Sequence, residues 1–570
     1  MKKKLIILLF AACFGINSFA QVAADPLDFF YTDLVIWETM GLVGPLPAAR
    51  PYPLQLVKQI LETVIEQGDA TQRGIAESHY GRFFNRFFSV GGKTQISYEF
   101  MSGDMQLEVA PAVDINLMLN RFLTVSGSLD IWATNRLPSD ALLPEHQMSE
   151  RDIIEDNARI GSFYILPSLN TSAAVGTSEY YFQVGLMRGS FGPFQENGVI
   201  VGQQALHSGQ FTFVIHKPKW TFNLSLYALS ATNDVKTDKF YPEKYLSLHS
   251  IDFHPFDWLS ISVLESMMYG GRFDIMYLIP FSAYMISQGN TGFNDNSFIG
   301  GTFTVKPLKG LKIDGVLYAD DLSFNDIIKL QWETKWRLAG QIGAAYAPPS
   351  SGIFTRVSFD YTMVTPYCYT HKADDNRNKY DINYQNYTHA GQSFGASLDP
   401  NSDRFNLKAT FRPLEKLDID LVGTLIRHGN VNENIGYKWV KEYLTKDIYN
   451  TDGSIHNNDD SLDSGHAYWD STPFLTQNTL QYIWQVGFDA VCRLPVLKTG
   501  GYMVFRAGYR FECNINANIN RSIYKYDETL DPDDDAAIEA RAKEQLAVWR
   551  NSATGRELNH YVFVGFEYFY

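Results

Sequence analysis

Clusters of acidic residues are the first feature of this chain that could do chemistry. Adjacent aspartates occur at 320–321, 374–375, 459–460 and 533–535. A glycosidase needs two carboxyl groups that face each other across a sugar, and neighbours in sequence do not supply that geometry. No cluster has the glycine that an EF-hand calcium loop requires at its sixth position. We interpret these clusters as solvated loop charge, with bridging cations such as calcium as an open alternative.

Histidines offer no better case for catalysis. His249, His254, His371 and His389 lack the spacing of HExxH or of paired CxxC and HxxxH zinc sites. The chain also has no Gly-x-Ser-x-Gly nucleophile elbow and no phosphate-binding loop. The sequence therefore predicts a protein that is not an enzyme and that holds no metal or cofactor. For His389, a structural hydrogen bond in a loop is favoured over direct ligand contact, and both remain open.

Aromatic side chains in polar segments indicate carbohydrate binding instead. Tyr and Trp present flat faces to the C–H faces of sugars, and neighbouring Asn and Asp can bond the hydroxyl groups. Packing within loops, or an aromatic girdle at the membrane surface, explains such residues equally well. The residues favoured for binding are Tyr387, His389, Asp403, Trp439 and Trp469, with Tyr384, Tyr437, Tyr443, Tyr449 and Tyr468 in the same segments.

The first residues indicate export. Lys2 to Lys4 form a basic region, Leu5 to Cys13 form an apolar run, and Ser18-Phe19-Ala20 offers a small-x-small cleavage site. This pattern predicts a signal peptide at 1–20. A rival interpretation makes Cys13 the lipidated residue of a loose lipobox, which the short apolar run disfavours.

Composition narrows the class of exported protein. No other segment approaches the ~20 consecutive apolar residues that a membrane helix needs. The chain nevertheless has 14% aromatic residues, with a mean hydropathy of −0.19, a combination typical of barrels with aromatic girdles and a polar lumen. Its net charge of −15 argues against nucleic acid as a partner. Cys368, Cys492 and Cys513 have no metal-ligand spacing.

Residues 21–92 have helical periodicity. Asp25-Pro26 is a predicted helix start, with apolar residues at three- and four-residue spacing up to Trp37 and with Gly41 near the end. Further helices are predicted from about Tyr52 to Gln67 and from about Asp69 toward Phe88. We interpret 21–92 as a small periplasmic helical bundle.

From residue 93 to 570 the period changes to two. Apolar and polar residues alternate over about ten positions in roughly 16 to 19 segments, such as 106–117, 219–228 and 416–425, which is the length of a transmembrane strand. Short turns alternate with long polar loops at about 364–402, 428–477 and 514–557. The chain ends on a strand with an apolar face that includes Val564 and Tyr570. These features predict a transmembrane antiparallel β-barrel in the outer membrane of a Gram-negative-type bacterium, with an even strand number and long extracellular loops.

Several segments occur in an order that is typical of one family. They are 31–34 with 41–43 and 51–54, the glycine-rich stretch 184–193, the strand–turn–strand 249–259, the acidic positions 295 and 320–321, and 387–395 followed by 400–403. In this order they resemble the Wzi family of capsule-assembly outer-membrane proteins. Phe191 stands where the family pattern has Trp, and the loops at 428–477 and 514–557 are particular to this chain.

The resemblance implies a barrel of about 18 strands behind a periplasmic helical bundle. It also implies a non-enzymatic role in attaching or organising an extracellular polysaccharide. From the residues alone, a porin or solute channel with a charged lumen remains the alternative, and an adhesin is a third. The expected partners are outer-membrane lipid and, through the C-terminal strand, the barrel-assembly machinery, and the barrel is expected to be a monomer.

Overall fold

The computed structural model describes residues 25–154, 157–233, 239–290, 295–321, 337–371, 382–446, 474–496 and 501–570. The predicted signal peptide at 1–20 and the candidate residue Trp469 lie outside these ranges. Within them, no helix is both long and apolar enough to cross a membrane.

The described segments form a closed antiparallel barrel of 18 strands. Strands β24 and β2 close it, in register from Gly91 opposite Phe569 to Glu99 opposite Tyr561. Closure leaves no unpaired strand edge in the membrane, and the predicted barrel with an even strand number is confirmed. The strands are β2 (Phe88–Glu99), β3 (Asp104–Met118), β4 (Leu123–Thr134), β6 (Phe163–Gly176), β7 (Tyr180–Met187), β9 (Ser208–Lys217), β10 (Trp220–Asn233), β11 (Tyr241–Phe256), β12 (Leu259–Gly270), β13 (Asn296–Leu308), β14 (Leu311–Asp321), β15 (Arg337–Tyr346), β16 (Phe354–Val364), β20 (Ser402–Leu414), β21 (Leu417–Gly429), β22 (Leu480–Val496), β23 (Gly501–Ile515) and β24 (Arg556–Phe569).

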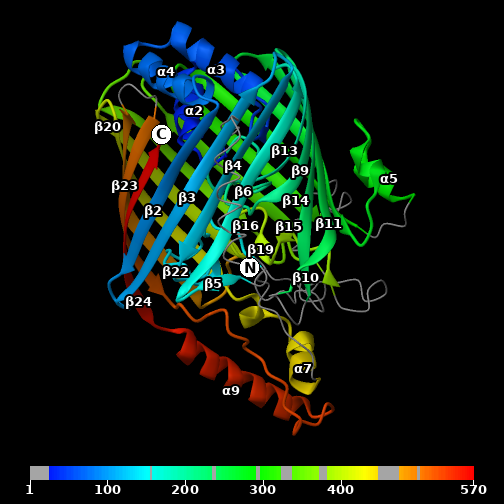
Figure 1. Ribbon diagram of the computed structural model, residues 1–570. Coiled ribbons are helices and arrows are strands. Elements are labelled where there is room, and N and C mark those ends of the chain that lie inside the picture. Colours follow the sequence, from blue (N-terminus) through cyan, green and yellow to red (C-terminus); the bar gives the residue numbers. More distant parts are fainter. Residues whose placement is uncertain are drawn as a thin grey trace, which may run out of the picture.

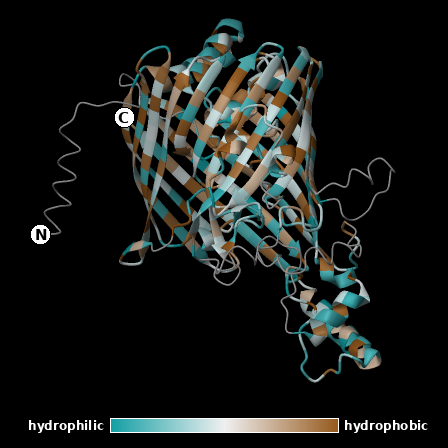
Figure 2. Cartoon of the chain, turned by 90° about the vertical axis from the view of Figure 1, so that its right-hand side faces the viewer, coloured by the Kyte–Doolittle hydropathy of each residue, from teal (hydrophilic) through white to brown (hydrophobic). Residues whose placement is uncertain are grey.

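The outer wall of the barrel is apolar because successive residues of a strand point to opposite faces. In β24, Val564 and Phe566 point outward, whereas Glu567 points into the lumen and pairs with Arg506. Hydrophobic and hydrophilic bands alternate along the strands in Figure 2. An apolar exterior around a polar lumen is the arrangement that lipid requires. The protein is an outer-membrane barrel.

Three helices lie at one mouth of the barrel (Figure 1): α2 (Phe29–Met40), α3 (Leu54–Gln67) and α4 (Ala70–Phe84). The carboxylates of Asp28 and Asp69 accept hydrogen bonds from backbone N–H groups in the first turns of α2 and α4, groups that have no partner within the helix. Gly41 ends α2 with a φ of 82°, a conformation that glycine adopts without strain. The predicted helical bundle ahead of the barrel is confirmed.

Two boundaries differ from the predicted ones by a few residues. Helix α2 begins after Asp28 rather than at Asp25-Pro26, because the Asp25 carboxylate accepts the N–H of Leu27 in a separate turn. Strand β2 already begins at Phe88, so the predicted boundary between 92 and 93 falls inside it. The helical segment therefore leads directly into the first strand.

Loop length differs between the two ends of the barrel. At the helical end, strands join through short turns, such as 218–219 between β9 and β10 and 257–258 between β11 and β12. At the other end β2 and β3 join through a short turn at 100–103, but most connections are longer, including 188–207, 365–401, 430–479 and 516–555. Short periplasmic turns and long outer loops are the rule for outer-membrane barrels. This rule indicates that the helical mouth faces the periplasm, and the two ends are named in that orientation below.

Two of the long loops form helices outside the barrel. Helix α7 (Tyr437–Thr445) and helix α9 (Asp535–Ala553) share one apolar cluster and project together from the extracellular end (Figure 1). We call this pair of helices the outer module.

Candidate functional site

One part of the chain lies in the lumen at its periplasmic end. Helix α2 and the segment 41–53, together called the inner plug, contact inward-pointing side chains of the wall. Lys312 of β14, for example, lies 3.6 Å from the carboxylate of Glu38 on α2. The inner plug thus lies inside the periplasmic mouth and is bonded to the wall.

A buried charge network, the latch, ties the inner plug to the wall. The Asp33 carboxylate of α2 accepts hydrogen bonds from Arg412 Nη2 at 3.0 Å, Arg493 Nη1 at 2.6 Å and His79 Nε2 at 2.9 Å. Arg412 and Arg493, on β20 and β22, also both donate to Asp418 of β21. The latch therefore joins α2 and α4 to three adjacent strands.

The protonation states of the latch follow from its contacts. Burial alone would raise the pKa of Asp33, but Arg493, His79 and Arg412 hold it well below its usual range. Burial lowers the pKa of His79. His79 Nδ1 faces Arg82 Nη2 at 3.3 Å, so Nδ1 accepts and Nε2 carries the proton that Asp33 receives. A neutral histidine and an ionised aspartate hold the latch closed.

The inner plug meets an extracellular loop inside the barrel. Ala49 and Arg50 form β1, which pairs with β8, Ser190–Phe191, in the loop 188–207. Arg50 Nη1 also donates to the carbonyl of Gly192 at 2.8 Å. The glycine-rich stretch around Phe191 thus connects the inner plug with the loop that enters the lumen from the other end.

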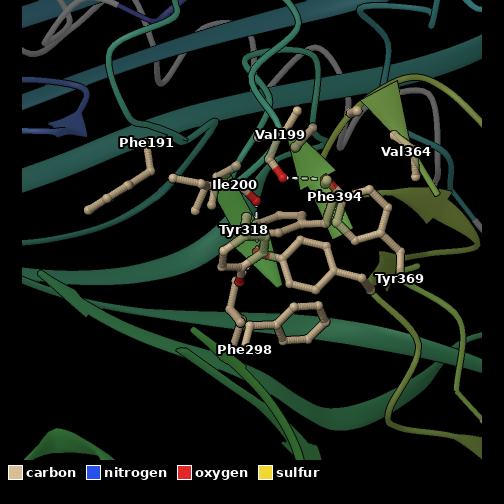
Figure 3. Close-up of a cluster of buried hydrophobic side chains, with 14 of the residues drawn as sticks. Phe191, Val199, Ile200, Phe298, Tyr318, Val364, Tyr369 and Phe394 are labelled. Atoms are coloured by element: carbon tan, nitrogen blue, oxygen red, sulfur yellow. Dashed lines mark hydrogen bonds between the residues drawn. The ribbon is translucent and has the colours of Figure 1, made fainter. Parts of the chain in front are cut away.

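The described parts of two loops, 188–207 and 365–371 with 382–401, lie in the lumen on its outer side, and we call them the outer plug. Tyr387 is fully buried, and its hydroxyl donates to the carbonyl of Ile200 at 2.7 Å. Tyr369 bonds the carbonyl of Val199 in the same way. Tyr318 of β14 donates to the Tyr387 hydroxyl at 3.1 Å. Figure 3 shows Tyr318 and Tyr369 packed beside Val199 and Ile200. Aromatic packing and hydroxyl–carbonyl bonds hold the outer plug.

The side chains of His389 and Asp403 also form hydrogen bonds with other parts of the fold. His389 is buried in the outer plug, where Nδ1 accepts the N–H of Ser230 at 3.0 Å and Nε2 donates to the carbonyl of His207 at 2.9 Å. Burial lowers its pKa. Asp403 is fully buried at the start of β20 and accepts two hydrogen bonds from Arg427. Both ring nitrogens of His389 and both carboxylate oxygens of Asp403 are thus engaged in hydrogen bonds within the fold.

Trp439 lies in the interior of the outer module and not at its surface. Its ring is buried between α7 and α9, in one cluster with Tyr443, Ile538 and Trp549. Tyr437, on the same helix, stays partly exposed and donates to the Asp535 carboxylate at 3.1 Å. The four described candidates, Tyr387, His389, Asp403 and Trp439, are thus not brought together and have almost no surface free for a glycan.

The acidic cluster at 320–321 is not fully solvated, in contrast to the prediction from the sequence. Asp320 is buried beside the outer plug and accepts the N–H of Tyr369 at 2.9 Å, because the loop 365–401 folds inward over the end of β14. The aspartates at 533–535 are exposed at the start of α9, as expected. Those at 374–375 and 459–460 lie outside the described residues. Within the described ranges, no group of three His, Cys, Asp or Glu side chains could hold a metal, and Cys368, Cys492 and Cys513 form no disulfide.

A polar cavity of about 580 Å³ remains in the lumen between α2 and the wall. Its charges are largely paired with one another: Lys93 lies 2.7 Å from Asp130, and Arg506 lies 3.1 Å from Glu567. The guanidinium of Arg151 lies 3.5 Å from the centroid of the Trp132 ring. Paired charges of both signs give the cavity no preference for one sign of ligand.

A second hollow, the rim pocket, opens at the extracellular edge of β3, β4 and β6, with a volume of about 560 Å³. Arg136 pairs with Asp104 at 2.8 Å across it. The Tyr164 ring lies beside them, with the guanidinium of Arg159 4.2 Å from its centroid. An aromatic face beside a carboxylate and guanidinium groups suits a sugar. Sequence reasoning missed this site because only strand pairing brings Asp104, Arg136 and Tyr164 together.

Comparison with known proteins supports the fold. No family model matches the chain, and no curated protein matches it. Among solved structures, it is similar to Wzi of Escherichia coli, described as an outer-membrane protein involved in group 1 capsule assembly and as a carbohydrate-binding β-barrel. The TM-score is 0.53 at 11% identity, over 96% of this chain and 99% of that one. This likeness agrees with the resemblance found in the sequence.

Other solved structures also match, with lower TM-scores. OccK5 of Pseudomonas aeruginosa has a TM-score of 0.38 at 8% identity, over 85% of this chain and 98% of that one. OccAB3 of Acinetobacter baumannii has 0.39 at 7%, over 85% and 98%. At these identities the comparisons establish an outer-membrane barrel fold.

Proposed function

We propose that this protein attaches or organises a surface polysaccharide and is neither an enzyme nor an open pore. The observation that carries the proposal is a lumen occupied from both ends. The latch fixes the inner plug to β20, β21 and β22, and Tyr369 and Tyr387 fix the outer plug. Passage of a solute would require both sets of buried bonds to break, so the outer surface is the part of the molecule left for function.

The rim pocket is the surface we propose for the glycan. Asp104, Arg136 and Tyr164 offer hydrogen-bond acceptors, donors and a ring face at the cell-surface end of the barrel. A single pocket of this kind binds a sugar weakly, but a polymer that engages many barrels at once is retained by avidity. Trp469, outside the described residues, stays a candidate for the same surface.

The test is retention of polysaccharide on cells. The variants Tyr164→Ala and Arg136→Ala should each shift glycan from the cell pellet to the medium by several-fold, with the amount of folded barrel unchanged. Val548→Ala, an exposed apolar position on α9 away from the rim pocket, is the matched control and should leave retention as in the wild type. Unchanged retention in both rim variants would exclude the rim pocket as the glycan site.

The channel alternative makes an opposite pair of predictions. A transport barrel would conduct ions steadily when purified, and deletion of its gene would leave the surface glycan as it was. The charged cavity beside α2 is the part of the lumen that such a channel would use. Steady conductance together with unchanged glycan in the deletion strain would replace our proposal with the channel.

Three further expectations belong to this proposal. We propose that residues 1–20 are a cleaved signal peptide, that strand β24 is the segment handed to the barrel-assembly machinery, and that the barrel works as a monomer. The outward apolar face of β24, with Val564 at 56% exposure, supports contact with lipid rather than with a second barrel.

A further inference from the structure

The connection between β12 and β13 does not stay at the rim of the barrel. Residues 271–290, which we call the side flap, contain a single helical turn at Ile275–Leu278 and the short helix α5, Tyr284–Gln288. Figure 1 shows α5 beside the barrel wall near β11, away from both mouths. The side flap therefore lies against the outer face of the wall.

Side chains beneath the side flap point outward and are nevertheless buried. Phe222 of β10 alternates with Asn223, whose amide bonds a lumen-facing carboxylate, so Phe222 points away from the lumen. Phe281 of the flap stacks on Phe222, with ring centroids 4.2 Å apart, and Phe222 has no exposed surface. On β12, Val263 is 58% exposed, whereas Met267 on the same face is fully buried. On β12, the flap therefore covers the wall from between Val263 and Met267 toward the extracellular end.

The covered wall carries polar side chains at positions that would otherwise face lipid. His249 of β11 lies opposite Glu265 of β12 on the outward face, and its Nε2 is 3.3 Å from the carboxylate. The N–H of Tyr284 donates to Glu265 at 2.8 Å, and Ser247 Oγ donates to the carbonyl of Tyr277 at 2.5 Å. Ionisable groups that face acyl chains directly are unfavourable. The flap supplies them with partners and a cover.

The base of the side flap is held by a second ion pair. Arg272 binds both oxygens of Asp295, at 2.9 and 2.5 Å, and so joins the two ends of the connection. The Tyr277 hydroxyl donates to the same carboxylate at 2.7 Å. These bonds fix where the flap leaves the rim and direct it down the wall.

The outer surface of the side flap is apolar. Ile286 is 78% exposed and Ile275 is 71% exposed, and Phe273, Ile279 and Phe281 are more than half exposed. On the same strands, the next outward positions toward the periplasm are also exposed and apolar, among them Phe253, Ile261 and Val263. The flap surface is thus continuous with the lipid-facing wall of the barrel.

We propose that the side flap is seated in the membrane, with its outer face among lipid acyl chains and its inner face shielding the His249–Glu265 pair from them. Lipid is the occupant because the flap lies on the face of the barrel that meets the membrane and continues that face. A polar seam in the wall is thereby sealed by the protein's own loop. The inference does not depend on the proposed function.

Fluorescence quenching in proteoliposomes tests the proposal. In a Cys492→Ser background, which removes the one described free thiol that is not buried, Ile286→Cys is labelled with an environment-sensitive dye in phosphatidylcholine vesicles. Quenching by acyl-chain spin labels should be as strong as for Val263→Cys on the bare wall. Val548→Cys on α9, which faces water, should respond to aqueous iodide instead. Ile275→Cys repeats the measurement at a second flap position.

The outcomes separate the possible occupants. If both flap positions respond to iodide as Val548→Cys does, the flap lies in water and the proposal is wrong. If neither iodide nor spin-labelled lipid reaches them, a second copy of the chain covers the flap, which also overturns it. Heat-modifiable migration in gels confirms that each labelled variant is a folded barrel before its quenching is compared.

Discussion

The two plugs of the lumen are built by different chemistry. The inner plug depends on charge, because Asp33 meets two arginines and a histidine at its contact with the wall. At the Tyr369 and Tyr387 contacts the outer plug depends on neutral groups: burial raises the pKa of both tyrosines well above the ordinary value of 10.0, so their hydroxyls stay protonated. The latch can therefore respond to acid within the ordinary pH range, whereas the Tyr369 and Tyr387 contacts cannot.

This difference indicates how each plug should respond when one of its contacts is removed. Buried ion pairs are costly to break when one partner is removed, because the other charge stays behind in a poorly solvated place. Aromatic packing loses stability in smaller steps as individual contacts are removed. Three perturbations of these two plugs, ordered by expected effect, test the comparison.

The largest effect is expected from Asp33→Ala. It leaves Arg412 and Arg493 buried with a single described carboxylate, Asp418, between them, which should cost about 3–5 kcal/mol of inner-plug docking. Limited proteolysis of the purified barrel should then cut within 41–53 much faster than in the wild type. Glu62→Ala, at an exposed pair on α3, is the matched control. Equal cleavage of all three proteins would mean that the latch does not hold the plug.

A smaller effect is expected from Tyr387→Phe. The change removes the hydroxyl that bonds the Ile200 carbonyl and should lower the stability of the outer plug by about 1–3 kcal/mol. Thermal unfolding followed by gel migration measures the loss. Tyr526→Phe, at an exposed ring in the outer loop, should have no such effect. Faster cleavage within 41–53 in Tyr387→Phe would show that the plugs are not independent.

The smallest effect is expected from mild acid. The pKa of His79 is depressed by burial, so its contribution to docking is complete above the ordinary value of 6.5 and is lost as the pH falls below it. The loss is at most about 1.4 kcal/mol for each pH unit. Asp33 adds a second loss only below its own ordinary value of 3.8. Cleavage within 41–53 should therefore increase between pH 6.5 and 3.8.

His79→Gln provides the control for this acid effect. It keeps a side chain that can donate to Asp33 but cannot take up a proton, so the increase in cleavage over this range should flatten. If cleavage within 41–53 still increases over this range in His79→Gln as it does in the wild type, His79 is not the group through which acid loosens the inner plug.

Much of the fold is readable from the sequence because strands and helices leave local patterns. Alternation over about ten residues gives the strands, and three- and four-residue spacing gives α2 to α4. The inward folding of loops leaves no such pattern. Tyr387 meets Ile200, a residue 187 positions away, and a buried tyrosine has the same appearance in a sequence as one that stacks on a sugar. This is why Tyr387 and Trp439 were predicted at a binding surface.

One feature that sequence reasoning missed, the wall covered by the side flap, did leave a pattern in the sequence. Ser247, His249 and Glu265 occupy outward positions of β11 and β12 where the barrel pattern expects apolar side chains. Polar residues at such positions indicate a covered wall, and they fall in the strands that flank the side flap. The rim pocket had no comparable signal, since Asp104 and Arg136 become neighbours only through the pairing of β3 with β4.

The central claim is that the lumen is closed at both ends, and single-channel recording tests it most directly. Purified wild-type protein in planar bilayers at neutral pH should show no steady conductance, because the latch and the Tyr369–Tyr387 contacts are both intact. Asp33→Ala should at most add brief openings, since the outer plug remains. A steady, voltage-independent conductance from the wild-type barrel would contradict the account.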